Sequence, residues 1–198
     1  MAGTMGILID GYEDIVNQIN SMNRDSAKVI NRTISDFKSR GPGWVSQEVV
    51  KEYNIKKKDV NETKKGVKNA GKVKVSGVSL DNIEIHYQGR VMTPTHFSMK
   101  PTSRPAKGKA YTVTAQIKKS GGRKVLGSSV FLGASGSEGT KQIPFQRVGD
   151  ARLPIKSVKT LSVPQMITNE KVTESINKRI SEELGKRLDH NLRRILNK

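Results

Sequence analysis

An apolar residue stands at every fourth position near the C-terminus, and this pattern constrains the fold more than any other feature. The seven residues are Val172, Ile176, Ile180, Leu184, Leu188, Leu192 and Leu196. A step of four residues advances about 400° on an α-helix, so the apolar stripe moves about 40° around the helix at each step. Such a helix needs different neighbours at its two ends. Its first half can pack on the chain's own sheet and its second half on another subunit; the alternative is a plain amphipathic helix whose burial wraps around it, which is the simpler interpretation for any single leucine.

The start of this helix is marked by a capping signal. Ser162 places a hydroxyl at the cap, Pro164 lies in the first turn, and Gln165 follows three residues after the serine. In such a capping box the two side chains bond to free backbone N–H groups of the first turn. We therefore predict a helix over residues 162–198.

Helical spacing also dominates the first third of the chain, where apolar residues recur over 15–22 and again over 29–37. We expect helices there, because this spacing places the apolar residues on one face. Gly41–Pro42–Gly43 predicts a helix end, since glycine favours the left-handed cap and proline cannot continue a helix. A new helix is expected from Ser46.

The apolar period changes to two from Lys72 onward. Alternation over residues 72–75, 83–87 and 111–118 predicts strands, of which the last is the clearest. Shorter strand candidates lie at 130–132, 143–145 and 155–158.

These patterns predict an α+β fold with N-terminal helices, a central and mostly antiparallel sheet with long loops, and a long C-terminal helix. We divide the chain into a helical region (1–65), a β-rich region (66–161) and the C-terminal helix (162–198), which we expect to form one structural domain. The β-rich region includes an extended arm over residues 93–109, which is too polar to build its own core.

The apolar content is low for a chain that folds alone. Of the 198 residues, 34% are apolar and 5% are aromatic, so little burial is available to offset the entropy of the chain. We expect neighbouring subunits to complete the core. The candidate subunit-interface residues are Ile180, Leu184, Leu188, Leu192, Pro101 and Pro105.

The sequence argues against disulfide, membrane and catalytic roles. It has no cysteine, no apolar run near the ~20 residues of a bilayer span, and no signal-peptide pattern at its start. Gly66–Val73 is close to a phosphate-binding loop, but Val73 replaces the hydroxyl that would hold magnesium. His86, His96 and His190 are scattered. We expect a soluble protein that starts unprocessed, with no enzyme activity, cofactor, metal, membrane contact or small-molecule substrate.

The formal charge is +18, and half of this excess lies between Glu84 and Glu138, where nine bases and no acid occur. A run of one sign is either a solvated loop or a place where an anionic partner sits. That partner is either DNA, contacted through its phosphates, or an acidic protein surface. The candidate contact residues are Lys56, Lys57, Lys58, Lys118, Lys119, Arg123 and Lys124.

Residues 46–62 suggest an alternative, because they fit two short helices about a turn at Asn54–Ile55, as in a helix-turn-helix. Lysines at the start of the second helix would contact phosphates rather than read bases. The alternative is therefore a DNA-binding protein without sequence specificity.

Short motifs at both ends of the chain carry a family resemblance. They are Ala27–Arg32, Val45–Val49 and Ile55–Lys56 in the N-terminal part, and Phe145–Gly149, Arg152–Ile155 and Val163–Met166 in the C-terminal part. In this order they resemble the phage minor tail protein Z family, the tail completion proteins of long-tailed phages and prophages. The motif residues singled out are Arg32, Arg147, Arg152, Pro154 and Pro164.

The resemblance implies a non-enzymatic virion protein of the tail and neck, present in the host cytoplasm during assembly. It implies a subunit of a ring, expected to be hexameric, at the head-proximal end of the tail. Its implied partners are its own copies, tail-tube and neck or connector proteins and, transiently, genome DNA. Ring contacts join different patches of neighbouring subunits, so we expect the C-terminal helix and the arm over 93–109 to connect the copies.

Overall fold

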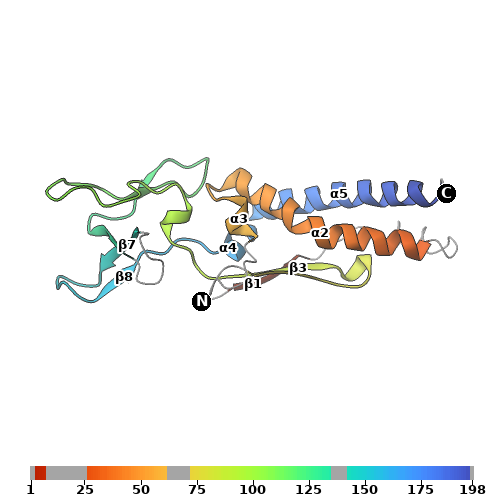
Figure 1. Ribbon diagram of the computed structural model, residues 1–198, viewed down its shortest axis with the longest axis horizontal. Coiled ribbons are helices and arrows are strands. Elements are labelled where there is room, and N and C mark those ends of the chain that lie inside the picture. The colour runs from red at the N-terminus through yellow and green to blue at the C-terminus, as the bar shows by residue number, and fades with distance from the viewer. Residues whose placement is uncertain (1–2, 8–25, 62–71, 135–141, 197–198) are drawn as a thin grey trace.

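The computed structural model of the chain describes residues 3–7, 26–61, 72–134 and 142–196. Figure 1 shows an elongated molecule with two long helices and a sheet at one end, and short strands and long loops at the other. We call the first part the helical lobe (residues 3–7, 26–61, 72–97 and 161–196) and the second the β lobe (residues 98–134 and 142–160). The predicted α+β fold with a long C-terminal helix is confirmed.

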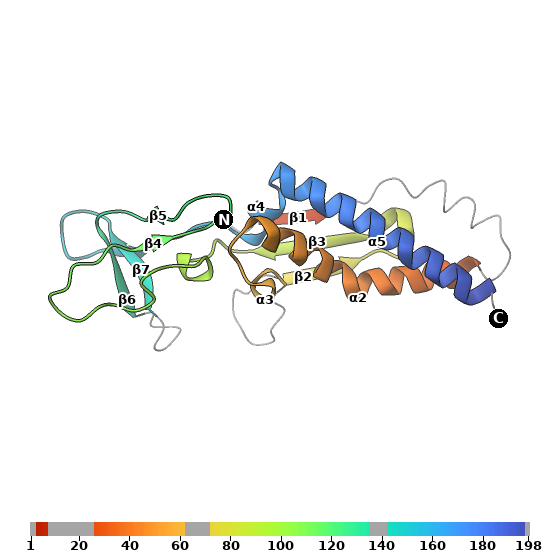
Figure 2. The same ribbon diagram turned by 90° about the horizontal axis from the view of Figure 1, so that it is seen from above.

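The two long helices of the helical lobe run antiparallel and pack on each other. They are α2 (Ser26–Glu52) and α5 (Glu170–Leu196). At one end the Lys171 ammonium donates to the Glu52 carboxylate at 3.1 Å, and at the other the Asn191 amide donates to the Thr33 hydroxyl at 3.2 Å. These contacts join the start of each helix to the end of the other, and Figure 2 shows α5 running obliquely over α2.

A three-stranded antiparallel sheet lies on the other side of α2 (Figure 1). Its strands are β1 (Gly3–Ile7), β2 (Lys72–Ser76) and β3 (Glu84–Gly89), with β3 in the centre. Ile85 and Tyr87 of β3 are buried in the main core, and burial raises the pKa of the Tyr87 phenol. Residues of β2 and β3 confirm the predicted alternation. β1 is a strand that the sequence did not reveal, because its five residues show no clear alternation.

The shorter helices complete the framework. They are α3 (Lys57–Val60), η1 (Leu80–Asn82), η2 (Pro94–His96) and α4 (Val163–Ile167). The capping box at Ser162 is confirmed, since its backbone N–H donates to the Gln165 carbonyl oxygen of the side chain at 2.9 Å. The predicted single helix is wrong in one respect, because α4 ends at Ile167 and α5 begins only at Glu170.

Helix α2 continues through Gly41–Pro42–Gly43, where the sequence predicted an end. Tertiary packing outweighs the local signals, because Phe37 and Trp44 on either side of the proline are buried and meet edge-to-face with ring centroids 6.0 Å apart. The Asn61 amide also donates to the Pro42 carbonyl at 2.7 Å. Ser46 therefore lies inside a helix rather than at the start of one.

Gly41 is required by the contact between α2 and the sheet. A Cβ at this position would lie 3.0 Å from Cδ1 of Ile85 and 3.3 Å from Cζ of Phe37. Gly185 of α5 differs, because a Cβ there would meet nothing within 4 Å. Of these two glycines, only Gly41 is explained by packing within the chain.

The apolar stripe of α5 is buried within the chain as far as Leu188. Ile180, Leu184 and Leu188 are at most 6% exposed and belong to the core shared with α2. After Leu188 the next buried position is Asn191, so a step of three residues reverses part of the drift, and Leu192 and Ile195 are both partly buried. The expectation that the second half of the helix packs on another subunit is therefore revised: only Leu192 of the candidate residues on this helix remains half-buried.

The β lobe has a small core of its own between two antiparallel sheets. Its strands are β4 (Thr114–Ala115) with β5 (Lys124–Val125), and β6 (Val130–Ala134), β7 (Gln142–Arg147) and β8 (Ile155–Ser157). The core residues are Met99, Val113, Ala115, Val130 and Leu132. The three short strand candidates of the sequence are confirmed as β6, β7 and β8.

The strand predicted over residues 111–118 forms a ladder only at Thr114–Ala115. The segment is extended with Val113 and Ala115 buried, but it changes partner along its length. Thr114 bonds to Lys100 and pairs with Val125, whereas the Ile117 carbonyl accepts from the Asn54 N–H at 2.8 Å. The alternation predicted correctly that Val113 and Ala115 are buried, but the prediction of one continuous strand over residues 111–118 is wrong.

The arm over residues 93–109 is only partly exposed. Phe97 is fully buried in the main core and Met99 in the β-lobe core, so the first half of the arm is fixed by both lobes. Residues 102–104 and 106–110 are exposed. The helix predicted over residues 15–22, the phosphate-loop-like residues 66–71 and most of the loop over 133–139 lie outside the described residues.

Gly41 and Gly185 give a matched test of the packing around α2. We expect Gly185→Ala to raise the free energy of unfolding by about 0.5–1 kcal/mol, because alanine favours helix and the site is open. Gly41→Ala brings the same helical gain but crowds Ile85, which costs about 1–3 kcal/mol, so we expect net destabilisation. Urea unfolding of both variants measures the difference, and equal stabilisation would contradict the close approach.

Candidate interaction surface

The end of α2 and the β4–β5 hairpin meet at the junction of the two lobes. The Lys119 N–H donates to the Glu52 carbonyl at 2.8 Å, and Tyr53 forms a bridge with Lys118. The Lys118 ammonium lies 5.8 Å from the centroid of the buried Tyr53 ring, within range of a cation–π contact. Backbone pairing and a buried aromatic ring thus fix the base of the β lobe on the helical lobe.

A second pair of linking segments runs beside this junction. The Met92 N–H donates to the Leu161 carbonyl at 3.0 Å, and the Thr160 N–H and hydroxyl both donate to the Met92 carbonyl. The segment that enters the β lobe is therefore bonded to the segment that leaves it. The β lobe is thus held at both of its ends.

The Glu52 carboxylate joins three elements at the junction. It accepts from Lys171 of α5 at 3.1 Å and from the Ser120 hydroxyl of the β4–β5 turn at 3.4 Å. The hydrogen bond and charge of Lys171 hold the pKa of the Glu52 carboxyl below its ordinary value, against a smaller effect of burial that raises it.

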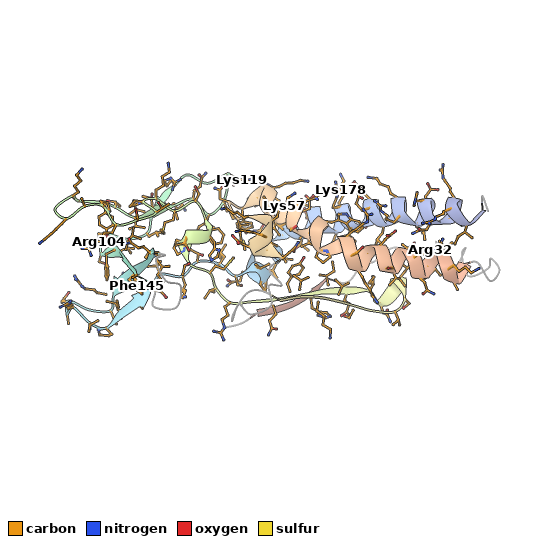
Figure 3. The ribbon with its side chains drawn as sticks, viewed as in Figure 1. Arg32, Lys57, Arg104, Lys119, Phe145 and Lys178 are labelled. Atoms are coloured by element: carbon orange, nitrogen blue, oxygen red, sulfur yellow. The ribbon has the colours of Figure 1, made fainter. Side chains whose placement is uncertain are left out.

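The junction brings together two groups of candidate lysines that are far apart in sequence. Lys56, Lys57 and Lys58 are exposed at and beyond the start of α3, while Lys118 and Lys119 follow the segment that bonds to Asn54. Figure 3 shows Lys57 and Lys119 in the same part of the molecule. We call these five residues the junction lysines.

The helix-turn-helix interpretation of residues 46–62 is not supported by this geometry. A turn does occur around Asn54–Ile55, but the first helix is the end of the long α2 and the second, α3, has four residues. A single helical turn is too short to lie along a major groove and present base-reading side chains.

Arg123 and Lys124, the other candidate contact residues, differ in their surroundings. The Arg123 guanidinium donates to the Ser98 carbonyl and, at 3.1 Å, to the Ser98 hydroxyl. Ser98 has a positive φ of 47° and lies between the buried Phe97 and Met99, so Arg123 supports a strained turn of the backbone. Lys124 lies exposed in β5.

The β lobe is cationic almost without compensation. Its described residues include twelve Lys or Arg and one acid, Asp150. The twelve cations are Lys100, Arg104, Lys107, Lys109, Lys118, Lys119, Arg123, Lys124, Arg147, Arg152, Lys156 and Lys159. Within the described part of the chain, none of them forms an ion pair with a carboxylate, whereas α5 carries several such pairs. An anionic surface on another molecule would neutralise this lobe.

The end of the β lobe farthest from the C-terminus consists of two loops, as both Figure 1 and Figure 2 show. One is the exposed part of the arm, near Arg104 in Figure 3, where Pro101 and Pro105 are half-buried. The other is the β7–β8 hairpin, in which residues 147–156 are all exposed.

The β7–β8 hairpin carries apolar side chains that the sequence did not identify as functional. Val148 is 58% exposed, Leu153 is 67% exposed and Ile155 is 38% exposed. Sequence alternation predicts which strand residues are buried, and it gives no sign that apolar residues of a turn are left in solvent. The family-motif residues Arg147 and Arg152 lie in the same hairpin and are exposed.

The other family-motif residues have structural positions. Arg32 is half-buried on α2, Pro164 is buried in the first turn of α4, and Pro154 is exposed beside Ile155. The motifs therefore do not form one cluster, since Arg32 lies at the opposite end of the molecule from the hairpin (Figure 3).

The described residues give no sign of a metal site or a membrane-spanning helix. No three His, Asp or Glu side chains of this part lie close enough together to hold a metal ion. His86 pairs with Glu84 at 2.7 Å and His96 with Asp59 at 3.4 Å, at separate places. None of the described helices is both long and apolar enough to span a membrane.

Comparison with known families decides the assignment of this elongated, basic chain. The sequence profile described as prophage minor tail protein Z matches residues 9–198. The chain belongs to the prophage minor tail protein Z family. No curated protein and no solved structure matches it. This minor tail protein Z family member is accordingly a structural protein of a phage tail and a component of the virion.

The carboxylate at the lobe junction gives a pH-dependent prediction. Because the pKa of Glu52 is lowered in the folded chain, its pairing stabilises the fold at neutral pH, and this contribution is lost as the pH falls through the folded pKa. We expect Lys171→Gln to lower the free energy of unfolding by about 0.2–1 kcal/mol at pH 7, and the gap to close well below pH 4.5.

Lys178→Gln is the control for this measurement, because Lys178 is an exposed lysine of the same helix. Urea unfolding of both variants from pH 7 to pH 3 gives the comparison. A gap for Lys171→Gln that stays constant over this range would show that the variant acts through something other than Glu52.

Proposed function

We propose that this chain completes the head-proximal end of the tail, as a subunit of a hexameric ring in the neck between the tail tube and the head connector. The observation that carries the proposal is a lobe whose described residues include twelve Lys or Arg and one acid, at one end of an elongated chain, in a member of a tail protein family. A tail protein of this form is suited to joining other virion surfaces, and the proposed role is assembly without catalysis.

The two lobes have separable tasks in this proposal. The helical lobe has a large core and buries the α5 stripe within the chain, so it supplies a stable base. Contacts between copies then fall to exposed elements, such as the outer part of the arm over residues 93–109, which lies at the end of the β lobe (Figure 1). A ring contact of this kind joins a different patch on each side of the subunit.

The net charge restricts how copies are arranged. Each chain carries +18, so six β lobes brought together around an axis repel unless an anionic partner lies among them. The ring therefore forms a positive collar that docks on acidic tail-tube or connector proteins and contacts genome DNA transiently. Before assembly the chain would be present in the host cytoplasm.

The junction lysines favour a second candidate function, which is contact with DNA without sequence specificity. Lys57 and Lys58 lie in α3 and Lys118 and Lys119 follow the paired backbone at Ile117, so one surface region carries several exposed cations. Lysines grouped in this way bind phosphates rather than base edges. Such binding falls steeply as salt is raised, because counterions are released from the DNA.

Deletion of the gene from the phage tests the tail-completion role. We expect filled heads and tails to be made but infectious particles to be lost, and purified chain added to the extract to restore them. Labelled antibody should mark the head-proximal end of the tail, and mass measurement should show six copies in a ring. Label at the distal tip, or undiminished infectivity without the gene, would contradict the proposal.

A further inference from the structure

We propose that the β7–β8 hairpin, residues 147–156, is the docking element that seats this chain on a tail protein with an acidic rim around an apolar recess. The inference rests on the proposed function for the place of contact, and on the hairpin itself for its chemistry. In this inference the contact with a protein is made by the hairpin and not by the junction lysines.

The hairpin is a built projection rather than a loose loop. Arg147 pairs with Ile155 in the strand register, and the Val148 N–H donates to the Pro154 carbonyl at 3.1 Å. The ladder therefore continues one residue beyond β7, and all ten residues from 147 to 156 remain exposed.

The base of the hairpin is held by aromatic packing. The rings of Phe131 and Phe145 stack with centroids 6.2 Å apart, and the Arg147 guanidinium lies 5.6 Å from the Phe131 centroid. Gly133 permits this arrangement, because a Cβ there would lie 3.0 Å from the Phe145 ring. Arg147 is thus oriented before any partner arrives, which reduces the entropy lost on binding.

The exposed side chains of the hairpin include both apolar and cationic ones. Val148, Leu153 and Ile155 are exposed and apolar, and Arg147, Arg152 and Lys156 are exposed cations of the same ten residues. Protein interfaces combine apolar contacts with polar ones and are enriched in Arg. Three exposed apolar side chains on one projecting hairpin favour an interaction site.

Two other occupants fit this surface less well. A DNA backbone offers phosphates to the arginines, but it has no apolar surface against which Val148, Leu153 and Ile155 could be buried. A second copy of the chain carries +18 itself, and its β lobe has one acid against twelve bases, so like charges oppose the contact. An acidic protein surface with an apolar recess satisfies both parts of the hairpin. Since the family is one of tail proteins, we assign that surface to the tail.

The experiment compares the full-length chain with two hairpin variants and one control. Val148→Ser with Leu153→Ser removes two exposed apolar side chains, and Arg152→Glu reverses one charge of the hairpin. The control, Lys57→Ser with Lys58→Ser, removes two exposed cations from α3 and leaves the hairpin intact. The probes are purified tails assembled without this protein, and random duplex DNA. Binding is measured by co-sedimentation over a range of salt, after urea unfolding has shown that each variant is folded.

We expect each hairpin variant to bind the tails at least 10-fold more weakly than the unaltered chain, with DNA binding by the apolar variant unchanged. The control should bind the tails within about twofold of the unaltered chain. Tail binding by the apolar variant equal to that of the unaltered chain would overturn the inference, as would a parallel loss of DNA binding. Loss of self-association by mass measurement, with tail binding kept, would identify a second copy as the occupant and overturn it.

The same measurements separate this inference from the proposed function. If the unaltered chain binds the head-proximal end of the tails and both hairpin variants bind equally well, the hairpin inference alone fails. If the unaltered chain does not bind these tails, the tail-completion role fails and the hairpin inference fails with it.

Discussion

The packing of α2 between α5 and the sheet is the constraint on which the rest of the structure depends. One helix has to satisfy two neighbours, and it does so with large side chains on both sides of Pro42 and with Gly41 where the sheet comes closest. The same helix ends at Glu52 and Tyr53, which bond to the β4–β5 hairpin. The position of the β lobe is therefore set by where α2 ends.

The sequence predicted the features that depend on neighbours in the chain. The capping box at Ser162, the alternation of β2 and β3 and the stripe of α5 all rest on local spacing, and the structure confirms them. The end predicted at Gly41–Pro42–Gly43 failed because burial of Phe37 and Trp44 outweighs the helix-breaking tendency of those residues. The partner of the α5 stripe was not predictable, since spacing shows that a face is buried but not by what.

The candidate surface was predictable in its charge and not in its geometry. Eight of the nine bases in the acid-free run lie in the β lobe, so composition located the basic region correctly. Chain distance concealed that Asn54 bonds to Ile117 and thereby brings two lysine groups together. The distance along the chain also concealed that the Arg123 guanidinium donates hydrogen bonds to Ser98. The exposed Leu153 left no signal, because a turn residue carries no periodicity from which its exposure could be inferred.

In the proposed role, the cations and the exposed apolar side chains of the β lobe act at different ranges, which would let one lobe serve two kinds of contact. Attraction between the unpaired cations and an anionic surface acts over roughly 8–10 Å in physiological salt and does not select one partner. Burial of Val148, Leu153 and Ile155 acts only on contact and needs a matching recess, so it supplies specificity. A cationic lobe without the apolar hairpin would adhere to DNA and acidic protein alike. In the proposed docking, the hairpin would make the lobe bind a protein in preference to DNA, and the packing of Phe131 on Phe145 at its base would fix the orientation of the hairpin.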